Sequence, residues 1–158
     1  MRDWPALLGV VYLLAVSVPL TLTDLRERRL PNKFVLPAFA VTLAGQVVAS
    51  ALGASLIRLP VAVGLAALLL ALGVVANLKF DFGMGDVKLI AAIGLTLGWF
   101  DPILPMLAIF IASLSASVWV GMRILVAGAT LKGSIALGPY LLLGFAASSM
   151  LLGLGGVL

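Results

Sequence analysis

The sequence contains no cysteine and no histidine among its 158 residues. Without cysteine, the chain has no disulfide framework and no thiolate zinc site. A Ser-His or Cys-His nucleophile pair is excluded, as is the paired-histidine zinc motif of metalloproteases. Any hydrolysis carried out by this chain's own residues must use carboxylates, lysine or serine. We expect no metal and no cofactor.

Charged residues are also scarce, at 10% of the chain against 63% hydrophobic residues. Soluble domains are roughly half apolar and about a quarter charged. We therefore expect one integral membrane domain over residues 1–158, with the lipid bilayer as its surroundings. A net charge of +4 would suggest nucleic acid as a partner of a soluble protein. Here the basic residues cluster in loops, where they set membrane orientation, so we expect no nucleic-acid binding.

Six apolar runs approach or exceed the length of about 20 residues that a membrane-spanning helix needs. They cover residues 4–23, 34–52, 60–78, 86–100, 102–125 and 137–157. The sequence thus predicts an all-α polytopic membrane protein with six transmembrane helices. The first run follows Arg2 as a secretory signal would, but it is long for one and lacks a small-x-small cleavage pattern. We interpret it as a retained helix.

Lysine and arginine are distributed unevenly over the two sides that six alternating spans define. Arg2 and Arg58 are on one side, and eight basic residues are on the other: Arg26, Arg28, Arg29, Lys33, Lys79, Lys88, Arg123 and Lys132. Basic loops remain in the cytoplasm. The second side is therefore predicted to be cytoplasmic, with the protein in the plasma (inner) membrane and both termini facing outward.

Two aspartates, Asp24 and Asp86, each lie where an apolar run meets a short basic segment on this predicted cytoplasmic side. Ionisable groups at such positions in a membrane protein usually serve a function. Two neighbouring carboxyl groups hold one proton between them. The ionised member can then take a proton from water while the protonated one polarises a carbonyl group. Such a pair can hydrolyse a peptide bond without histidine, cysteine or metal.

Glycines surround the second aspartate, in the order Gly83-Met84-Gly85-Asp86. Their missing side chains would let a substrate backbone approach closely. The start of a helix at Asp86 would favour its negative charge by about 0.3–1 kcal/mol. Pro31 and Asn32 end the segment that follows Asp24. Further along, Gly94 and Gly98 form a G-x-x-x-G spacing that lets a neighbouring helix approach.

Each of these residues also has a structural interpretation. Asp24 could be an interfacial residue paired with Arg28, and Asp86 could be a helix N-cap. Lys88 is expected to extend to the surface, although it could tune Asp86. The other acidic residues on this side, Glu27 and Asp81, are interpreted as solvated loop charges. Nothing in the spacing of Lys132 and Ser134 favours Ser-Lys catalysis.

Residues 24–32 (DLRERRLPN) and 83–89 (GMGDVKL) together resemble the two signatures of type IV prepilin peptidases, which are membrane aspartyl proteases of the GxGD class. A third segment, residues 137–144, resembles the Gly-Pro segment that opens this family's last helix. The resemblance spans the whole chain. It implies Asp24 and Asp86 as the catalytic pair. The matching motif positions that would support them are Gly83, Gly85, Lys88, Pro31, Asn32, Gly138 and Pro139.

The resemblance also implies a substrate, a prepilin or pilin-like precursor cut on the cytoplasmic side between its short basic leader and its hydrophobic helix. Larger relatives carry an extra region with paired cysteines and methylate the new N-terminus. This chain has no cysteine, and so resembles the short, peptidase-only form of Flp or tight-adherence pilus systems. Archaeal preflagellin peptidases share the architecture and remain an alternative. No oligomeric state is predicted.

Three other functions remain open. A proton- or cation-coupled transporter would continue the polar residues across the bilayer, and Ser113, Ser115 and Ser117 are a partial hint of such a stripe. Serine in membrane helices more commonly packs helices together. A noncatalytic pilin-assembly factor would not need both carboxylates. A lipoprotein signal peptidase would lack the Gly-x-Gly-Asp arrangement.

Overall fold

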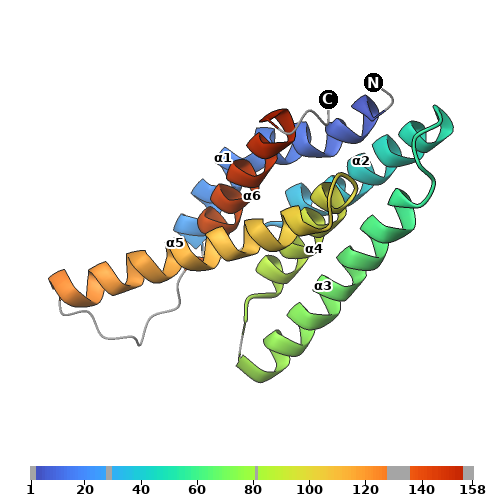
Figure 1. The fold of residues 1–158 in the computed structure, drawn as a ribbon. Helices are drawn as coiled ribbons and strands as arrows, with labels where there is room; N and C mark the ends of the chain where they lie inside the picture. The colour runs from blue at the N-terminus through green and yellow to red at the C-terminus, as the bar shows by residue number, and fades with distance from the viewer. Residues whose placement is uncertain (1–2, 28–29, 81, 128–135, 155–158) are drawn as a thin grey trace.

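The computed structural model describes residues 3–27, 30–80, 82–127 and 136–154. A short 3-10 helix, η1 (Trp4–Ala6), leads into the first of six α-helices. These helices are α1 (Leu7–Glu27), α2 (Asn32–Ala51), α3 (Arg58–Phe80), α4 (Met84–Gly98), α5 (Ile103–Ala127) and α6 (Gly138–Leu154). Figure 1 shows them as one elongated bundle, in which the start of α1 and the end of α6 lie at the same end. The predicted all-α fold with six helices is confirmed.

Most helix boundaries agree with the apolar runs to within a few residues, but α1 continues to Glu27 instead of ending near residue 23. Leu25, Arg26 and Glu27 are all good helix formers, and no helix breaker follows until Pro31. Pro31 is the N-cap of α2 and has extended backbone angles. Asp24 therefore lies within the last turn of α1 and not at the beginning of a loop.

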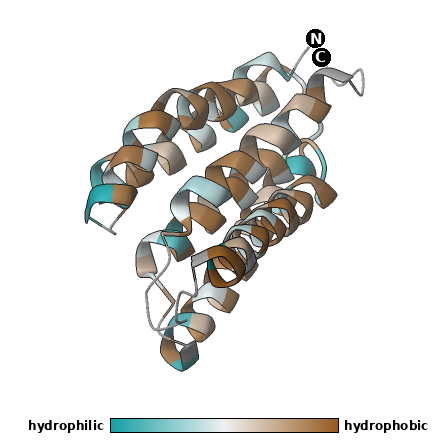
Figure 2. Ribbon diagram, turned by 90° about the vertical axis from the view of Figure 1, so that its left-hand side faces the viewer, coloured by the Kyte–Doolittle hydropathy of each residue, from teal (hydrophilic) through white to brown (hydrophobic). Residues whose placement is uncertain are grey.

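Within the described residues, four helical segments are long and apolar enough to cross a membrane: Trp4–Glu27, Asn32–Ala51, Arg58–Lys79 and Ile103–Val126. The apolar part of α6, Gly138–Leu152, is shorter, and α4 has only 15 residues. Hydrophobic residues dominate the helix shafts, while hydrophilic residues gather towards the helix ends (Figure 2). The chain is a multi-pass membrane protein.

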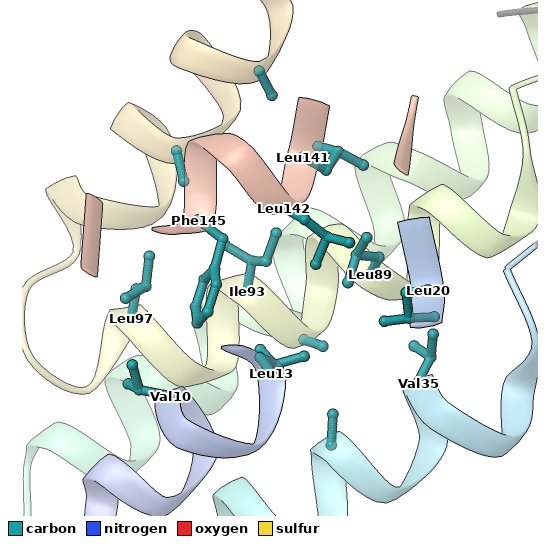
Figure 3. Close-up of a cluster of buried hydrophobic side chains, with 14 of the residues drawn as sticks. Val10, Leu13, Leu20, Val35, Leu89, Ile93, Leu97, Leu141, Leu142 and Phe145 are labelled. Atoms are coloured by element: carbon teal, nitrogen blue, oxygen red, sulfur yellow. The ribbon is translucent and has the colours of Figure 1, made fainter. Parts of the chain in front are cut away.

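The shortest helix, α4, is the centre of the bundle. It contacts all five other α-helices, and almost every residue from Val87 to Trp99 is buried. In Figure 3, Leu89, Ile93 and Leu97 of α4 meet side chains from α1, α2 and α6, and Phe145 of α6 packs among them. At 1.5 Å per residue, α4 is about 22 Å long, which is shorter than the bilayer core of about 30 Å.

Small and polar residues bring α2 and α3 close to α4. A Cβ on Gly98 would lie 3.5 Å from Cα of Ala62 in α3, and one on Gly94 would lie 3.4 Å from Cα of Ala66. The close helix approach predicted from the G-x-x-x-G spacing is confirmed. From the other neighbouring helix, Gln46 of α2 donates a hydrogen bond to the Leu95 carbonyl at 2.7 Å. Close packing at small residues and interhelical hydrogen bonds commonly hold helices together in lipid, where burial of apolar surface drives little association.

The two ends of the bundle differ in what they bring together. At one end, Asp3 forms a 2.9 Å ion pair with Arg58, at the start of α3, and accepts a hydrogen bond from the Trp99 indole at 3.3 Å. The opposite end holds the last turn of α1 and the starts of α2, α4 and α6. Both Asp24 and Asp86 lie at this second end.

Candidate active site

Asp24 is a buried carboxylate, with only 4% of the residue exposed. It lies in the last turn of α1, and its Oδ2 atom accepts a hydrogen bond from the backbone N–H of Gly138 at 3.0 Å. Gly138 is the first residue of α6, where backbone N–H groups have no partner inside the helix. The contact therefore joins two helix ends that are 114 positions apart in the sequence.

Glycine at position 138 makes this contact sterically feasible. A Cβ there would lie 2.7 Å from Asp24 Oδ2 and 3.2 Å from Leu30 Cδ2. Any larger residue would push against the carboxylate that the backbone holds. Pro139 follows in the first turn of α6, a position where proline's lack of an N–H costs no helical hydrogen bond. The Gly-Pro pair thus begins α6 directly against Asp24.

Asp86 is the third residue of α4, whose N-cap is Gly83. The structure therefore does not place Asp86 at the N-cap position itself. Among the described residues, no donor reaches its Oδ1 atom, which is buried. Its other oxygen lies over Gly83, where an added Cβ would be 2.8 Å away. Leaving a buried polar atom without a hydrogen-bond partner costs free energy of folding. A functional role is one reason for a protein to keep such an atom.

The two aspartates belong to one electrostatic site, since the charge of Asp24 acts on Asp86. Leu30 connects their surroundings. It is buried against Gly138 on the Asp24 side, and a Cβ on Gly85 would lie 2.9 Å from its own Cβ. Leu30 thus fills the space between the starts of α4 and α6. Its contact with Gly85 leaves no room for a side chain at position 85. Leu30 is part of the first motif, but sequence reasoning assigned it no role, because a single leucine between Arg29 and Pro31 gives no sign of contacts with remote glycines.

Lys88 connects the two sequence motifs directly. Its Nζ atom donates a hydrogen bond to Oδ1 of Asn32 at 3.0 Å, at an exposed position. Asn32 begins α2 and Lys88 lies in the second turn of α4. The side chain extends to the polar end of the bundle, as the sequence predicted, but its partner was not foreseen. The bond ties the segment that follows Asp24 to the helix that carries Asp86.

The remaining candidates contribute less to this site. Glu27 is exposed at the end of α1. Asp81, Arg28, Lys132 and Ser134 fall outside the described residues. Within the part of the chain that the structure describes, no three acidic, histidine or cysteine side chains come together as a metal site.

The serines of α5 do not extend a polar path from the aspartates. Ser113 donates its hydroxyl to the Ile109 carbonyl at 2.8 Å, and Ser117 donates to the Ser113 carbonyl at 2.7 Å. Ser115 likewise bonds to the carbonyl of Ala112 at 3.0 Å. All three hydroxyl protons are thus used within their own helix. This arrangement is the ordinary one for serine in a membrane helix.

Comparison with known proteins agrees with these motifs. The model of the type IV leader peptidase family matches residues 10–121, which is more than half of the chain and includes both aspartates. No curated protein and no solved structure matched the chain. The resemblance inferred from the two motifs is confirmed. The chain belongs to the type IV leader peptidase family and is an aspartic-type prepilin peptidase of the membrane.

Proposed function

We propose that the protein cuts the short basic leader from prepilin-like precursors at the cytoplasmic membrane face, with Asp24 and Asp86 as the catalytic pair. The observation that supports this most strongly is the convergence of two carboxyl groups from different helices at one end of the bundle. One is held by a backbone N–H, and the other has a buried oxygen without a described donor. Membership of the family implies the class of substrate.

The chemistry needs one proton shared between the two carboxyl groups. The ionised carboxylate takes a proton from a water molecule as the water oxygen attacks the carbonyl carbon of the peptide bond. The other carboxyl group gives its proton to the carbonyl oxygen, which produces a tetrahedral diol. The first group then passes its proton to the nitrogen, the second recovers one from a diol hydroxyl, and the C–N bond breaks. A carboxylic acid and an amine leave, and the pair again holds one proton.

The position of the pair suits such a substrate. A pilin precursor has an apolar helix that lies in the bilayer, with the scissile bond at the interface. Asp24 and Asp86 lie at the ends of α1 and α4, so they would meet this bond without drawing it deep into hydrocarbon. The uneven distribution of basic residues supports a cytoplasmic position for this end. The absence of cysteine supports a single peptidase domain without methyltransferase activity.

The direct test is leader removal from a co-expressed candidate prepilin, followed by the mobility of the pilin on gels. We expect Asp24→Asn and Asp86→Asn each to lower the cleavage rate by at least about 100-fold, because general acid–base groups typically contribute 10²–10⁴-fold. Asp101→Asn is the matched control. Asp101 is exposed and accepts a hydrogen bond from Ile103 N at 2.7 Å, so its replacement should leave the cleavage rate unchanged.

Cleavage that persists in either catalytic variant, with equal amounts of protein in the membrane, would refute the catalytic pair. Wild-type protein that moves protons across vesicles but cuts no prepilin would favour the transport alternative. Processing that is lost in the Asp101→Asn control as well would point to a general effect of charge removal.

A further inference from the structure

The surroundings of the two carboxyl groups differ in one respect that bears on how they share a proton. Asp24 Oδ2 accepts the Gly138 N–H at 3.0 Å. Asp86 Oδ1 is buried, and none of the described residues donates to it. A hydrogen-bond donor stabilises a carboxylate more than a neutral carboxyl group, while burial without a donor penalises the charged form. The surroundings therefore stabilise the charged form of Asp24 more than the charged form of Asp86.

The dipoles of α1 and α4 favour the opposite arrangement, with the negative charge on Asp86 instead of Asp24, but their effect is weaker. The start of α4 favours a negative charge on Asp86, and the end of α1 disfavours one on Asp24. Each effect changes a protonation equilibrium by about two- to fivefold. A hydrogen bond to a charged group changes it by roughly 10- to 100-fold. The N–H of Gly138 also lies at the start of α6, whose own dipole favours a negative charge on Asp24.

We propose that Asp24 is the ionised member of the pair and acts as the general base, that Asp86 carries the shared proton and acts as the general acid, and that Gly138 fixes this division through its backbone N–H. The proposal rests on the function proposed above. Asp24 then takes the proton from water, and Asp86 donates its proton to the carbonyl oxygen. Gly138 is a positioning residue, since it acts only through Asp24.

Other charged groups at this end leave the assignment in place. The ionisable side chains described there are Asp24, Arg26 and Glu27 on α1, Lys33 on α2, Lys79 on α3, Asp86 and Lys88 on α4, Arg123 on α5 and Tyr140 on α6. Among them, Asp86 feels the charge of Asp24. Lys88 is engaged by Asn32, and Arg26, Glu27, Lys33 and Arg123 are exposed.

The test is to replace the Gly138 amide by an ester, by incorporating glycolic acid at position 138 during cell-free synthesis into lipid discs. This change removes the N–H and adds no side chain. Cleavage of a prepilin peptide is then measured as a function of pH. For a pair that shares one proton, activity rises with pH as the pair loses its first proton and falls as it loses its second.

The proposal predicts which limb of this profile moves. Losing the N–H destabilises every state in which Asp24 is ionised. If Asp24 is ionised in the active form, the rising limb shifts to higher pH by about one unit, and the falling limb stays in place. If Asp86 were the ionised member, Asp24 would ionise only in the second step. The falling limb would then shift to higher pH instead, and the assignment would be overturned.

A second ester serves as the control, because an ester at position 138 also weakens the Leu137 carbonyl as an acceptor. That carbonyl accepts a hydrogen bond from Leu141 N at 3.0 Å. Replacing Leu141 by its hydroxy acid removes the same bond but leaves the contact with Asp24, so neither limb should move. An unchanged profile in the Gly138 ester would overturn the proposal. Complete inactivity of the Gly138 ester beside an active Leu141 ester would also overturn it. The proposal predicts that loss of the N–H shifts the pH profile of cleavage and does not abolish cleavage.

Failure here is distinct from failure of the proposed function. If Asp24→Asn and Asp86→Asn both abolish cleavage while the wrong limb moves in the ester, the catalytic pair stands and only the division of roles falls. If either asparagine variant still cuts the precursor, the pair itself is wrong.

Discussion

Gly138 is the residue on which Asp24 depends most directly, because its N–H reaches the carboxylate and its missing side chain leaves room for the contact. The sequence resemblance pointed to the Gly-Pro segment but supplied no physical role for it. Leu30 is similar, since it lies inside the first motif but the motif did not indicate that it fills the space between Gly85 and Gly138. Single-residue roles of this kind depend on neighbours that are remote in sequence.

Gly138→Ala should lower prepilin cleavage at least about tenfold, because the new Cβ would stand 2.7 Å from Asp24 Oδ2 and must displace the carboxylate. Gly121→Ala is the matched control. A Cβ at Gly121 meets nothing within 4 Å, and alanine is favoured over glycine in a helix by about 1 kcal/mol. Cleavage rates per amount of membrane protein are the measurement, and equal rates in both variants would contradict the steric argument.

At the scale of helices, α4 is the element that sequence reasoning understood least. Its apolar run is the shortest of the six predicted spans, yet it contacts every other α-helix. In a soluble protein, a polar face would have revealed which side of each helix packs inward. In lipid, the side facing the membrane is as apolar as the side facing the core, so the pattern carries little information about neighbours. The G-x-x-x-G spacing was an exception, because small residues indicate close packing directly.

The Lys88–Asn32 bond predicts that α2 and α4 cooperate in holding the site. Asn32→Ala and Lys88→Met should each reduce cleavage by up to about tenfold, which is less than for a buried hydrogen bond with a charged group because this one is exposed to water. The exchanged pair, Asn32→Lys with Lys88→Asn, places a donor and an acceptor at the same positions in reverse. It should therefore recover activity above the product of the effects of Asn32→Lys and Lys88→Asn, each measured alone. If the two substitutions change the cleavage rate strictly multiplicatively, the contact between the two side chains does not contribute to activity.

At the scale of the whole molecule, the proposed cytoplasmic position of the end that carries Asp24 and Asp86 rests on the uneven distribution of basic residues over the loops. Because the chain has no cysteine, single cysteines report topology without a background. A membrane-impermeant maleimide added to intact cells should label Leu56→Cys, which is 75% exposed at the opposite end, and should not label Lys33→Cys. Both variants should react after the cells are opened. The reverse pattern in intact cells would put the aspartates outside and contradict the proposed site of cleavage.

The membrane-spanning helical architecture was determined by the sequence itself. A chain with 63% hydrophobic residues must satisfy its backbone hydrogen bonds within lipid, and helices do so locally. The two carboxyl groups and their glycines were also evident, because polar residues are conspicuous in such a chain. Tertiary structure alone decided that α6 begins against Asp24, that Leu30 packs between two glycines and that α4 lies at the centre. These contacts join segments up to 114 positions apart, and in lipid they depend on close packing and single hydrogen bonds, which leave no periodic signal in the sequence.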